Sequence, residues 1–239
     1  MLPLTDFVRP KRLPVVTLAL TAANLLVWFA YELPHGVDHS ALHLGFRPCE
    51  ITHACHDTQL SWPLQVVTMM FTHGGWSHIV GNLVFLLVFG PRVEELLGRS
   101  RYLLTYFAAG IVADALQGGL TLAFAVPADA RVPNIGASGA ISGVLGAYAV
   151  AYPFERVLAW VIPVFFLRIP ALGLLGVWFL LQAAEGSYAL ANPAAVVSVA
   201  FFAHVGGFLT GAAAAIWFRR SAMPAGWSRA ATLPSARPR

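Results

Sequence analysis

Four polar residues of this chain have types and spacings that could do chemistry: His78, Asn82, Ser138 and His204. A serine hydroxyl within hydrogen-bond reach of an imidazole is the arrangement of a nucleophile and its general base. His78 and Asn82 are four residues apart, so they share one face of a helix, and both can donate hydrogen bonds to the oxyanion of a tetrahedral intermediate. Together these residue types favour an acyl-transfer reaction with serine as the nucleophile.

The segments around these residues are strongly apolar. Of the 239 residues, 58% are hydrophobic and 11% are charged, and the mean hydropathy is +0.69. A soluble domain carries about a quarter of its residues as charged side chains. Apolar runs of roughly 20 residues cross the hydrocarbon core as helices, and the strand-like alternation of a barrel is absent from this sequence. We therefore expect an all-α, polytopic membrane helical bundle, in which polar side chains at membrane depth are functional candidates.

Six apolar segments are expected to cross the membrane. The first is too long for a signal peptide and lacks a small-residue cleavage site, so we treat it as a retained span. The six segments are Leu13–Tyr31, Trp76–Leu96, Tyr102–Leu122, Gly136–Pro153, Pro170–Ala184 and Val196–Phe218.

The basic residues indicate how these spans are oriented. With a cytoplasmic N-terminus, 13 of the 15 Lys and Arg residues fall inside, and only Arg47 and Arg131 fall outside. This asymmetry follows the positive-inside rule, so both termini are expected in the cytoplasm. The net charge of +4 then reflects topology and does not indicate a nucleic-acid partner. The inside set is Arg9, Lys11, Arg12, Arg92, Arg99, Arg101, Arg156, Arg168, Arg219, Arg220, Arg229, Arg237 and Arg239.

The expected organisation follows from these spans. Residues 1–12 form a cytoplasmic N-terminus, 13–218 the membrane domain, and 219–239 a basic, disordered cytoplasmic tail. The long external segment 32–75 is expected to lie partly in the membrane interface. Residues 157–168, "VLAWVIPVFFLR", are too short to span and are expected to form an interfacial or re-entrant segment on the inner side.

Depth and small residues predict that Ser138 and His204 meet. The second, fourth and sixth spans all enter from the outside, and at 1.5 Å per residue His78, Ser138 and His204 fall in the outer leaflet. Glycines at three- and four-residue steps let helices in lipid approach closely. Such glycines are Gly136, Gly139, Gly143 and Gly146 on the fourth span, and Gly207 and Gly211 on the sixth. A serine near the start of its helix would add free backbone N–H groups and the positive end of the helix dipole.

Each signal also has a simpler interpretation. The glycines around Ser138 could serve packing alone, His204 could bond a neighbouring carbonyl, and Asn82 could join helices. Asp114 could complete a triad, but we expect a helix-end or interface role for it, and we expect His73 at the interface. Two other classes of protein stay open: a haem protein with two histidine ligands, and a channel or transporter lined by these groups. A third alternative, a binding or chaperone-like relative without activity, is less favoured because Ser138 and His204 are both present.

Cys49 and Cys55 both lie in the external segment, a compartment that permits disulfides. A bridge between them is one interpretation. With His53 and His56, the stretch "CEITHACH" could instead bind a metal, but its spacing matches no strong zinc signature. We expect no metal.

Four stretches between about Trp62 and Phe218 resemble the rhomboid family of intramembrane serine proteases: "HGGWSHIVGN", "GPRVEELLG", "GASG" and "AHVGGFLTG". The resemblance implies that Ser138 is the nucleophile and His204 the base of a dyad without an acidic third member. It implies an oxyanion hole of His78, Asn82 and the Ser138 N–H, and a structural role for Glu94. It also implies that the substrates are single transmembrane helices of membrane proteins, cut near the outer face without a cofactor. From the compact bundle we expect a monomer in a bacterial inner membrane.

The chain departs from the family at one position. Many rhomboids carry Trp-Arg ahead of the second span, whereas this sequence has Trp62-Pro63. Proline supplies neither charge nor N–H. Any arginine that anchors the external segment must therefore come from elsewhere, and Arg47 is the candidate.

Overall fold

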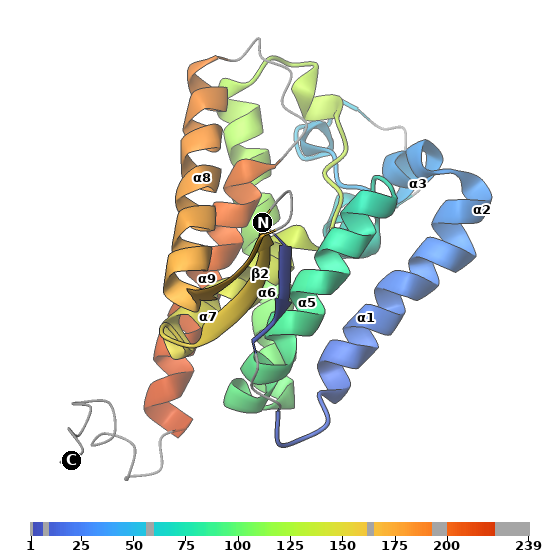
Figure 1. Cartoon of the computed structure of the whole chain (residues 1–239). Coiled ribbons are helices and arrows are strands. Elements are labelled where there is room, and N and C mark those ends of the chain that lie inside the picture. The colour runs from blue at the N-terminus through green and yellow to red at the C-terminus, as the bar shows by residue number, and fades with distance from the viewer. Residues whose placement is uncertain (1, 7–9, 56–59, 162–164, 193–199, 223–239) are drawn as a thin grey trace, which may run out of the picture.

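The computed structural model describes residues 2–6, 10–55, 60–161, 165–192 and 200–222, and these fold mainly into helices (Figure 1). Helix α1 (Val15–Val27) continues through a π-helical turn (Trp28–Glu32) into α2 (Leu33–His35). Five further long helices follow, and each overlaps one of the predicted spans: α5 (Trp76–Leu97), α6 (Arg99–Phe124), α7 (Ser138–Ala151), α8 (Ala171–Ala191) and α9 (Phe201–Ala222).

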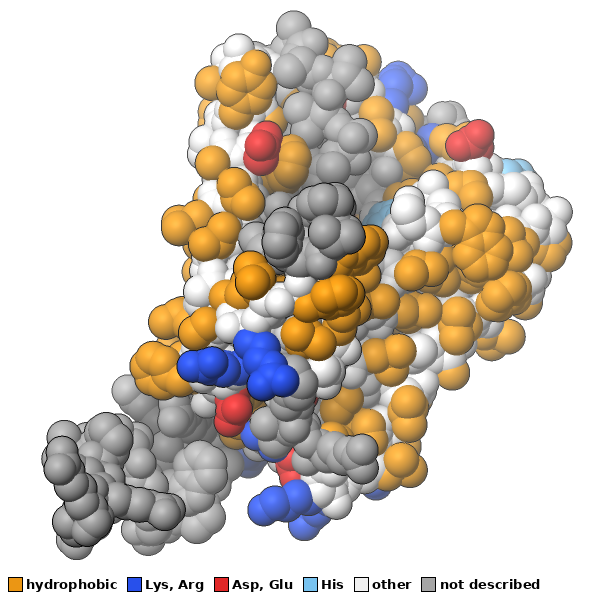
Figure 2. Space-filling model, viewed as in Figure 1, with side chains coloured by type: hydrophobic (Ala, Val, Ile, Leu, Met, Phe, Trp, Pro, Cys, Tyr) orange, Lys and Arg blue, Asp and Glu red, His pale blue; other side chains and the backbone are white. Residues whose placement is uncertain are grey.

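The prediction of a membrane helical bundle is confirmed. Three stretches in the described part of the chain are long and apolar enough to cross a membrane, namely Val15–His35, Arg99–Phe124 and Phe201–Phe218. The total of six spans stays a prediction. Large apolar side chains are exposed along these helices, among them Leu26 (67%) and Leu104 (62%). In Figure 2 such side chains cover much of the visible face, and Lys and Arg gather towards its lower part. Lipid contact explains so much exposed apolar surface.

The segment between α1 and α5 is built from short helices. These are α3 (Val37–Leu44), a 3₁₀ turn at Pro48–Glu50, α4 (Trp62–Thr68) and a second 3₁₀ turn at Met69–Phe71. Another 3₁₀ turn, Asp129–Arg131, lies between α6 and α7. The two connections are joined by a pair of backbone hydrogen bonds between Phe46 and Asn134, of 3.1 and 2.7 Å.

A small antiparallel sheet was not predicted from the sequence. Strand β1 (Leu2–Thr5) pairs with β2 (Arg156–Val161), which pairs with β3 (Phe165–Pro170). Residues 157–161 and 165–168 therefore lie in paired strands, and the predicted cytoplasmic N-terminus contributes a third strand; the interfacial or re-entrant position of 157–168 stays a prediction. Side chains alternate along β2, where Val157 and Ala159 are buried and Arg156 and Trp160 are exposed, which is the pattern of a strand with one covered face. Pro163 lies outside the described residues.

The other end of the chain differs slightly from prediction. Helix α9 continues to Ala222, four residues into the predicted tail. Residues 223–239, the rest of the predicted disordered tail, lie outside the described part of the chain, as do residues 193–199 at the predicted start of the sixth span.

Helix α7 is the centre of the bundle, and its residues 139–149 are all buried. It lies against α9 through the predicted glycines. A Cβ added to Gly207 would collide with the carbonyl oxygen of Gly139, and one added to Gly211 would collide with that of Gly143. Because the backbones of α7 and α9 touch directly, side chains at the N-terminal end of each helix lie within hydrogen-bond reach of each other.

Glu94 on α5 joins two helices at the other end of the bundle. Its carboxylate accepts hydrogen bonds from the backbone N–H groups of Val16 and Thr17, at 3.0 and 2.8 Å, and from the Thr17 hydroxyl at 2.8 Å. These N–H groups belong to the first turn of α1, where backbone N–H groups have no acceptor within their own helix. A buried carboxylate that accepts three hydrogen bonds at the positive end of a helix dipole is a structural cap.

Replacing Glu94 with alanine is therefore expected to cost about 3 kcal/mol or more in the free energy of unfolding, since charge-assisted hydrogen bonds are lost and buried N–H groups are left unpaired. Thermal or detergent-induced unfolding of the purified protein measures this cost. The neighbouring Glu95→Ala is the matched control, because the ion pair of Glu95 with Arg92 is only partly buried and is worth about 0–1 kcal/mol. Equal unfolding midpoints for the two variants would contradict the role of Glu94.

Candidate active site

Ser138 is the first residue of α7, and the segment before it is held from two sides. Gly136 donates its N–H to the carbonyl of Met69 at 2.9 Å, and Asn134 pairs with Phe46. Gly136 has φ of +120°, a conformation that L side chains rarely adopt. The turn at Gly136 brings the chain into α7 so that the Ser138 N–H lies in the first helical turn, where backbone donors have no partner within the helix.

Ser138 and His204 form a hydrogen-bonded pair. The distance between Ser138 Oγ and His204 Nε2 is 2.8 Å, and the two residues are 66 positions apart in the chain. His204 stands in the first turn of α9, and the close contact between α7 and α9 brings it to the serine. The pair has the geometry of a nucleophile with its general base.

A second hydrogen bond fixes the other side of the imidazole, and it was not predicted from the sequence. His204 Nδ1 contacts the side-chain oxygen Oε1 of Gln182, which lies on α8. The ring of Trp178, one turn earlier on α8, has its centroid 5.7 Å from that of His204. A single amide within the apolar stretch "GVWFLLQAA" was the available signal, since polar residues at membrane depth are costly.

His78 is held as a hydrogen-bond donor beside the serine. Its Nδ1 accepts the N–H of Gly74 at 3.2 Å, so in the neutral ring Nε2 carries the proton. A Cβ built on Gly136 would lie 2.7 Å from this Nε2 and 3.6 Å from Ser138 Oγ. The N–H of His78 and the hydroxyl of Ser138 therefore flank the same point of the backbone.

Asn82 lies one turn further along α5, on the same face as His78. It is 8% exposed. Its amide nitrogen Nδ2 has no hydrogen-bond partner among the described residues. Buried donors in proteins are normally bonded, so this nitrogen is available to a ligand bound beside His78.

Glu32 and His73 are an additional buried pair behind His78, and their contact was not predicted. Glu32, in the π-helical turn after α1, accepts the backbone N–H of His73 at 2.9 Å. Both side chains are completely buried, and the expected position of His73 at the membrane interface stays a prediction. The ring of His73 meets that of His78 edge-on, with 5.2 Å between centroids. His73 thus lies against the imidazole that faces Ser138, and Glu32 holds the backbone of His73.

Asp114 does not complete a triad with His204. Its carboxylate accepts a hydrogen bond from Asn134 Nδ2 at 2.9 Å, and it is 2% exposed. It does not stand at a helix end either, since α6 continues to Phe124. Asp114 instead attaches the segment that leads into Ser138 to α6, and its expected place at the membrane interface stays a prediction.

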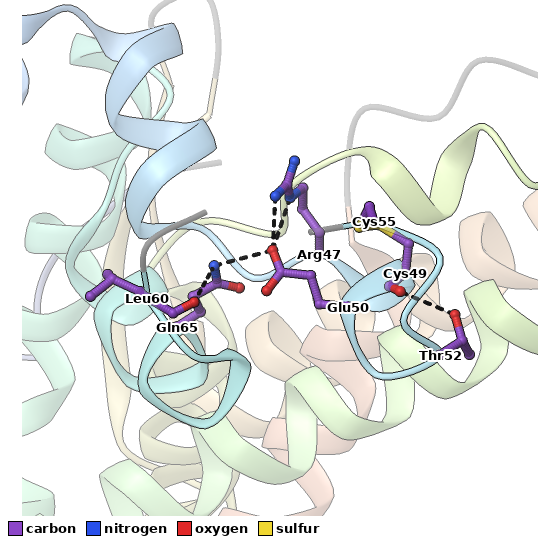
Figure 3. Close-up of polar contacts among 7 residues, drawn as sticks. All are labelled: Arg47, Cys49, Glu50, Thr52, Cys55, Leu60 and Gln65. Atoms are coloured by element: carbon purple, nitrogen blue, oxygen red, sulfur yellow. Dashed lines mark hydrogen bonds and ion pairs between the residues drawn. A yellow bond between two sulfur atoms is a disulfide. The ribbon is translucent and has the colours of Figure 1, made fainter. Parts of the chain in front are cut away.

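The external segment has its own polar centre (Figure 3). Arg47 Nη2 lies 2.9 Å from Glu50 Oε1 in a buried ion pair, and Gln65 Nε2 donates to the same oxygen at 3.2 Å. Cys49 and Cys55 are joined by a disulfide. Glu50 thus links the segment 45–55 to α4, which begins at Trp62-Pro63, and Arg47 pairs with the carboxylate that makes this link.

No group of three or more His, Cys, Asp or Glu residues in the described ranges is arranged to hold a metal ion. His56, one of the four residues of the alternative hypothesis of a metal site, lies outside those ranges.

The loop closed by the Cys49–Cys55 disulfide also contacts the connection between α6 and α7. Arg131 Nη2 donates to the carbonyl of Ala54 at 3.1 Å, so this loop rests against the connection that precedes Ser138.

Comparison with known proteins agrees with the fold and with the sequence motifs. Residues 61–221, about two thirds of the chain, match the Rhomboid domain. The fold is that of a helical membrane bundle. The domain match shows that the chain belongs to the rhomboid family.

Three relatives illustrate the similarity. The rhomboid protein YdcA of Bacillus subtilis is 30% identical over 145 residues, which are 61% of this chain and 66% of YdcA. Rhomboid protease GluP of the same organism is 31% identical over 56% of this chain and 24% of its own length. Rhomboid-related protein 2 of Mus musculus is 27% identical over 84% of this chain and 62% of its own length. The chain therefore spans less than two thirds of each of these relatives.

Proposed function

We propose that this chain is an intramembrane serine endopeptidase. The observation that carries the proposal is the 2.8 Å contact between His204 Nε2 and Ser138 Oγ in a member of the rhomboid family. The name of the relative GluP as a protease supports it. Both ring nitrogens of His204 are engaged by protein groups, an arrangement that suits a base better than a haem ligand.

In the proposed reaction, Ser138 Oγ attacks the scissile carbonyl carbon while its proton moves to His204 Nε2. His204 then gives this proton to the leaving amine, and the peptide bond breaks with Ser138 acylated. In the second half, His204 takes a proton from water, the hydroxide attacks the ester, and Ser138 leaves with the proton returned by His204. No metal or organic cofactor takes part in these steps.

The tetrahedral intermediates carry a negative oxygen that needs donors. His78 Nε2, Asn82 Nδ2 and the Ser138 N–H are the proposed donors. The evidence for His78 is its Nδ1 bond to Gly74, which leaves the proton on Nε2. The evidence for Asn82 is its buried amide nitrogen, which has no hydrogen-bond partner in the part of the chain that the structure describes.

The proposed substrates are single-pass membrane proteins. A peptide bond in an intact helix is shielded and its carbonyl is already bonded, so the substrate must unwind locally near the cut, which Gly and Pro make easier. With both termini in the cytoplasm, the dyad lies in the outer leaflet, where water can reach it. We propose that the protein acts as a monomer in a bacterial inner membrane, within the lipid bilayer and without nucleic acid.

Labelling with a fluorescent fluorophosphonate tests this proposal. Detergent-purified wild type is compared with Ser138→Ala and His204→Ala, and the adduct is mapped by mass spectrometry. We expect an adduct on Ser138 of the wild type only. Folded wild-type protein that takes up no label would favour a transporter, a haem protein or an inactive relative.

Replacing Asn82 with alanine is expected to lower kcat about 100- to 1,000-fold, since one oxyanion donor is lost, and to leave the fold intact. Initial rates of cleavage of a transmembrane substrate in liposomes measure the loss. Asn24→Ala is the matched control, because Asn24 is also a buried asparagine, but its amide donates to the Leu20 carbonyl within α1 at 2.7 Å, on a helix that carries none of the proposed site residues. Equal rates for wild type and Asn82→Ala would remove Asn82 from the oxyanion hole.

A further inference from the structure

We propose that Gln182 is the positioning residue of the catalytic base. The site is then a hydrogen-bonded triad of Ser138, His204 and Gln182, in which the third member is neutral and takes up no proton. This inference rests on the proposed serine protease function. Gln182 touches neither the serine nor the place of the scissile bond; it acts through His204.

The two contacts of the imidazole assign its protons. In a neutral ring one nitrogen carries the proton and the other accepts. A base that takes the Ser138 proton at Nε2 must carry its own proton on Nδ1. The group facing Nδ1 is the side-chain oxygen of Gln182, which can only accept. Gln182 therefore stabilises the one tautomer in which His204 can deprotonate Ser138, and it fixes the plane of the ring.

A neutral amide suits this position in a membrane. A carboxylate there would have to be buried at a large desolvation cost whenever the imidazole is uncharged. Within the described part of the chain, no carboxylate hydrogen-bonds to His204, and Asp114 is bonded to Asn134. An amide oxygen orients the ring at a lower cost, although its dipole stabilises the imidazolium less than a negative charge would.

Helix α8 holds the amide in place through aromatic contacts with α9. Trp178 and Gln182 are four residues apart, so both face His204. Trp178 lies against the rings of His204 and Phe208, with centroid distances of 5.7 and 6.3 Å, and Phe179 lies 4.8 Å from Phe208. The position of α8 therefore decides whether the oxygen of Gln182 reaches Nδ1.

Two substitutions separate the acceptor from the shape of the side chain. Gln182→Met keeps a similar length but removes the acceptor, and kcat is expected to fall about 10- to 100-fold with KM unchanged, because only the base is affected. Gln182→Glu keeps an acceptor at the same place, and it is expected to hold kcat within about threefold of wild type at pH 8. Rates of fluorophosphonate labelling should follow the same order without any substrate.

The matched control is Gln117→Met. Gln117 also reaches α9 from a neighbouring helix, but its side-chain oxygen accepts the backbone N–H of Phe202 at 3.2 Å and does not contact the ring. The kcat of Gln117→Met is expected to stay near that of wild type. If Gln182→Met cleaves as fast as wild type, or if Gln182→Met and Gln182→Glu lose kcat equally with native melting, the inference is wrong.

A measurement on the ring itself distinguishes this failure from failure of the proposed function. Protein with ¹⁵N-labelled histidine is examined by NMR, and the His204 signals are assigned by their loss in His204→Gln. We expect a proton on Nδ1 in the wild type and a mixture of tautomers in Gln182→Met. An unchanged His204 spectrum in Gln182→Met would overturn the inference. Cleavage by Ser138→Ala would instead overturn the proposed function, whatever the ring signals show.

Discussion

Ser138→Ala is expected to cleave no transmembrane substrate at all. Removing the nucleophile of a serine protease lowers kcat by about six orders of magnitude, which takes the rate to the background of any gel-based assay. His204→Ala should fall as far, because members of one catalytic unit are not additive. The measurement is cleavage of a single-span substrate in liposomes, over hours and at an enzyme concentration close to that of the substrate.

The control for this loss is a second serine on the same helix. Ser142 lies one turn after Ser138, is buried, and donates its hydroxyl to the Ser138 carbonyl at 2.6 Å. Ser142→Ala removes a buried hydroxyl from α7 without removing the proposed nucleophile, so its rate should stay within about fivefold of wild type. If Ser138→Ala keeps measurable activity in a preparation free of other proteases, the dyad is wrong.

The sequence predicted the helices well because lipid imposes a simple rule on them. Each spanning segment must satisfy its backbone internally and expose apolar side chains, so the run from Trp76 to Leu97 was predicted to within one residue. The glycines of α7 and α9 also have a direct physical meaning. Only residues without a Cβ allow the contact between Gly207 and the Gly139 carbonyl, and from that contact the meeting of Ser138 and His204 could be predicted.

The remaining contacts depend on three-dimensional proximity that no local pattern carries. The strand Leu2–Thr5 pairs with a segment about 155 residues later, and neither strand has a strong signal alone. The contact of Gln182 with His204 depends on the rotation of α8, and the contact of Glu32 with His73 depends on a π-helical turn. Single polar residues in apolar spans could be identified as candidates, but their partners could not.

Gly136→Ala is expected to lower kcat at least about 100-fold, a smaller loss than that of either dyad residue. At φ of +120° an L side chain is strained by about 1–3 kcal/mol. The new methyl group would also lie 2.7 Å from His78 Nε2 and 2.8 Å from its Cε1, closer than Cβ atoms approach other atoms in proteins. Either the His78 ring turns away from the oxyanion or the turn before Ser138 opens. Both changes displace a group that must be placed within about 0.5 Å.

Kinetics and unfolding together separate these two effects. We expect the unfolding midpoint of Gly136→Ala to fall modestly, and kcat of the folded protein to fall at least about 100-fold, since a displaced oxyanion donor is lost as fully as a deleted one. Gly119→Ala is the control, because a Cβ there meets nothing within 4 Å, and it should leave both quantities near wild type. Full activity in folded Gly136→Ala would mean that His78 does not lie beside Ser138 during catalysis. Stabilisation of the oxyanion would then depend on Asn82 and the Ser138 N–H alone.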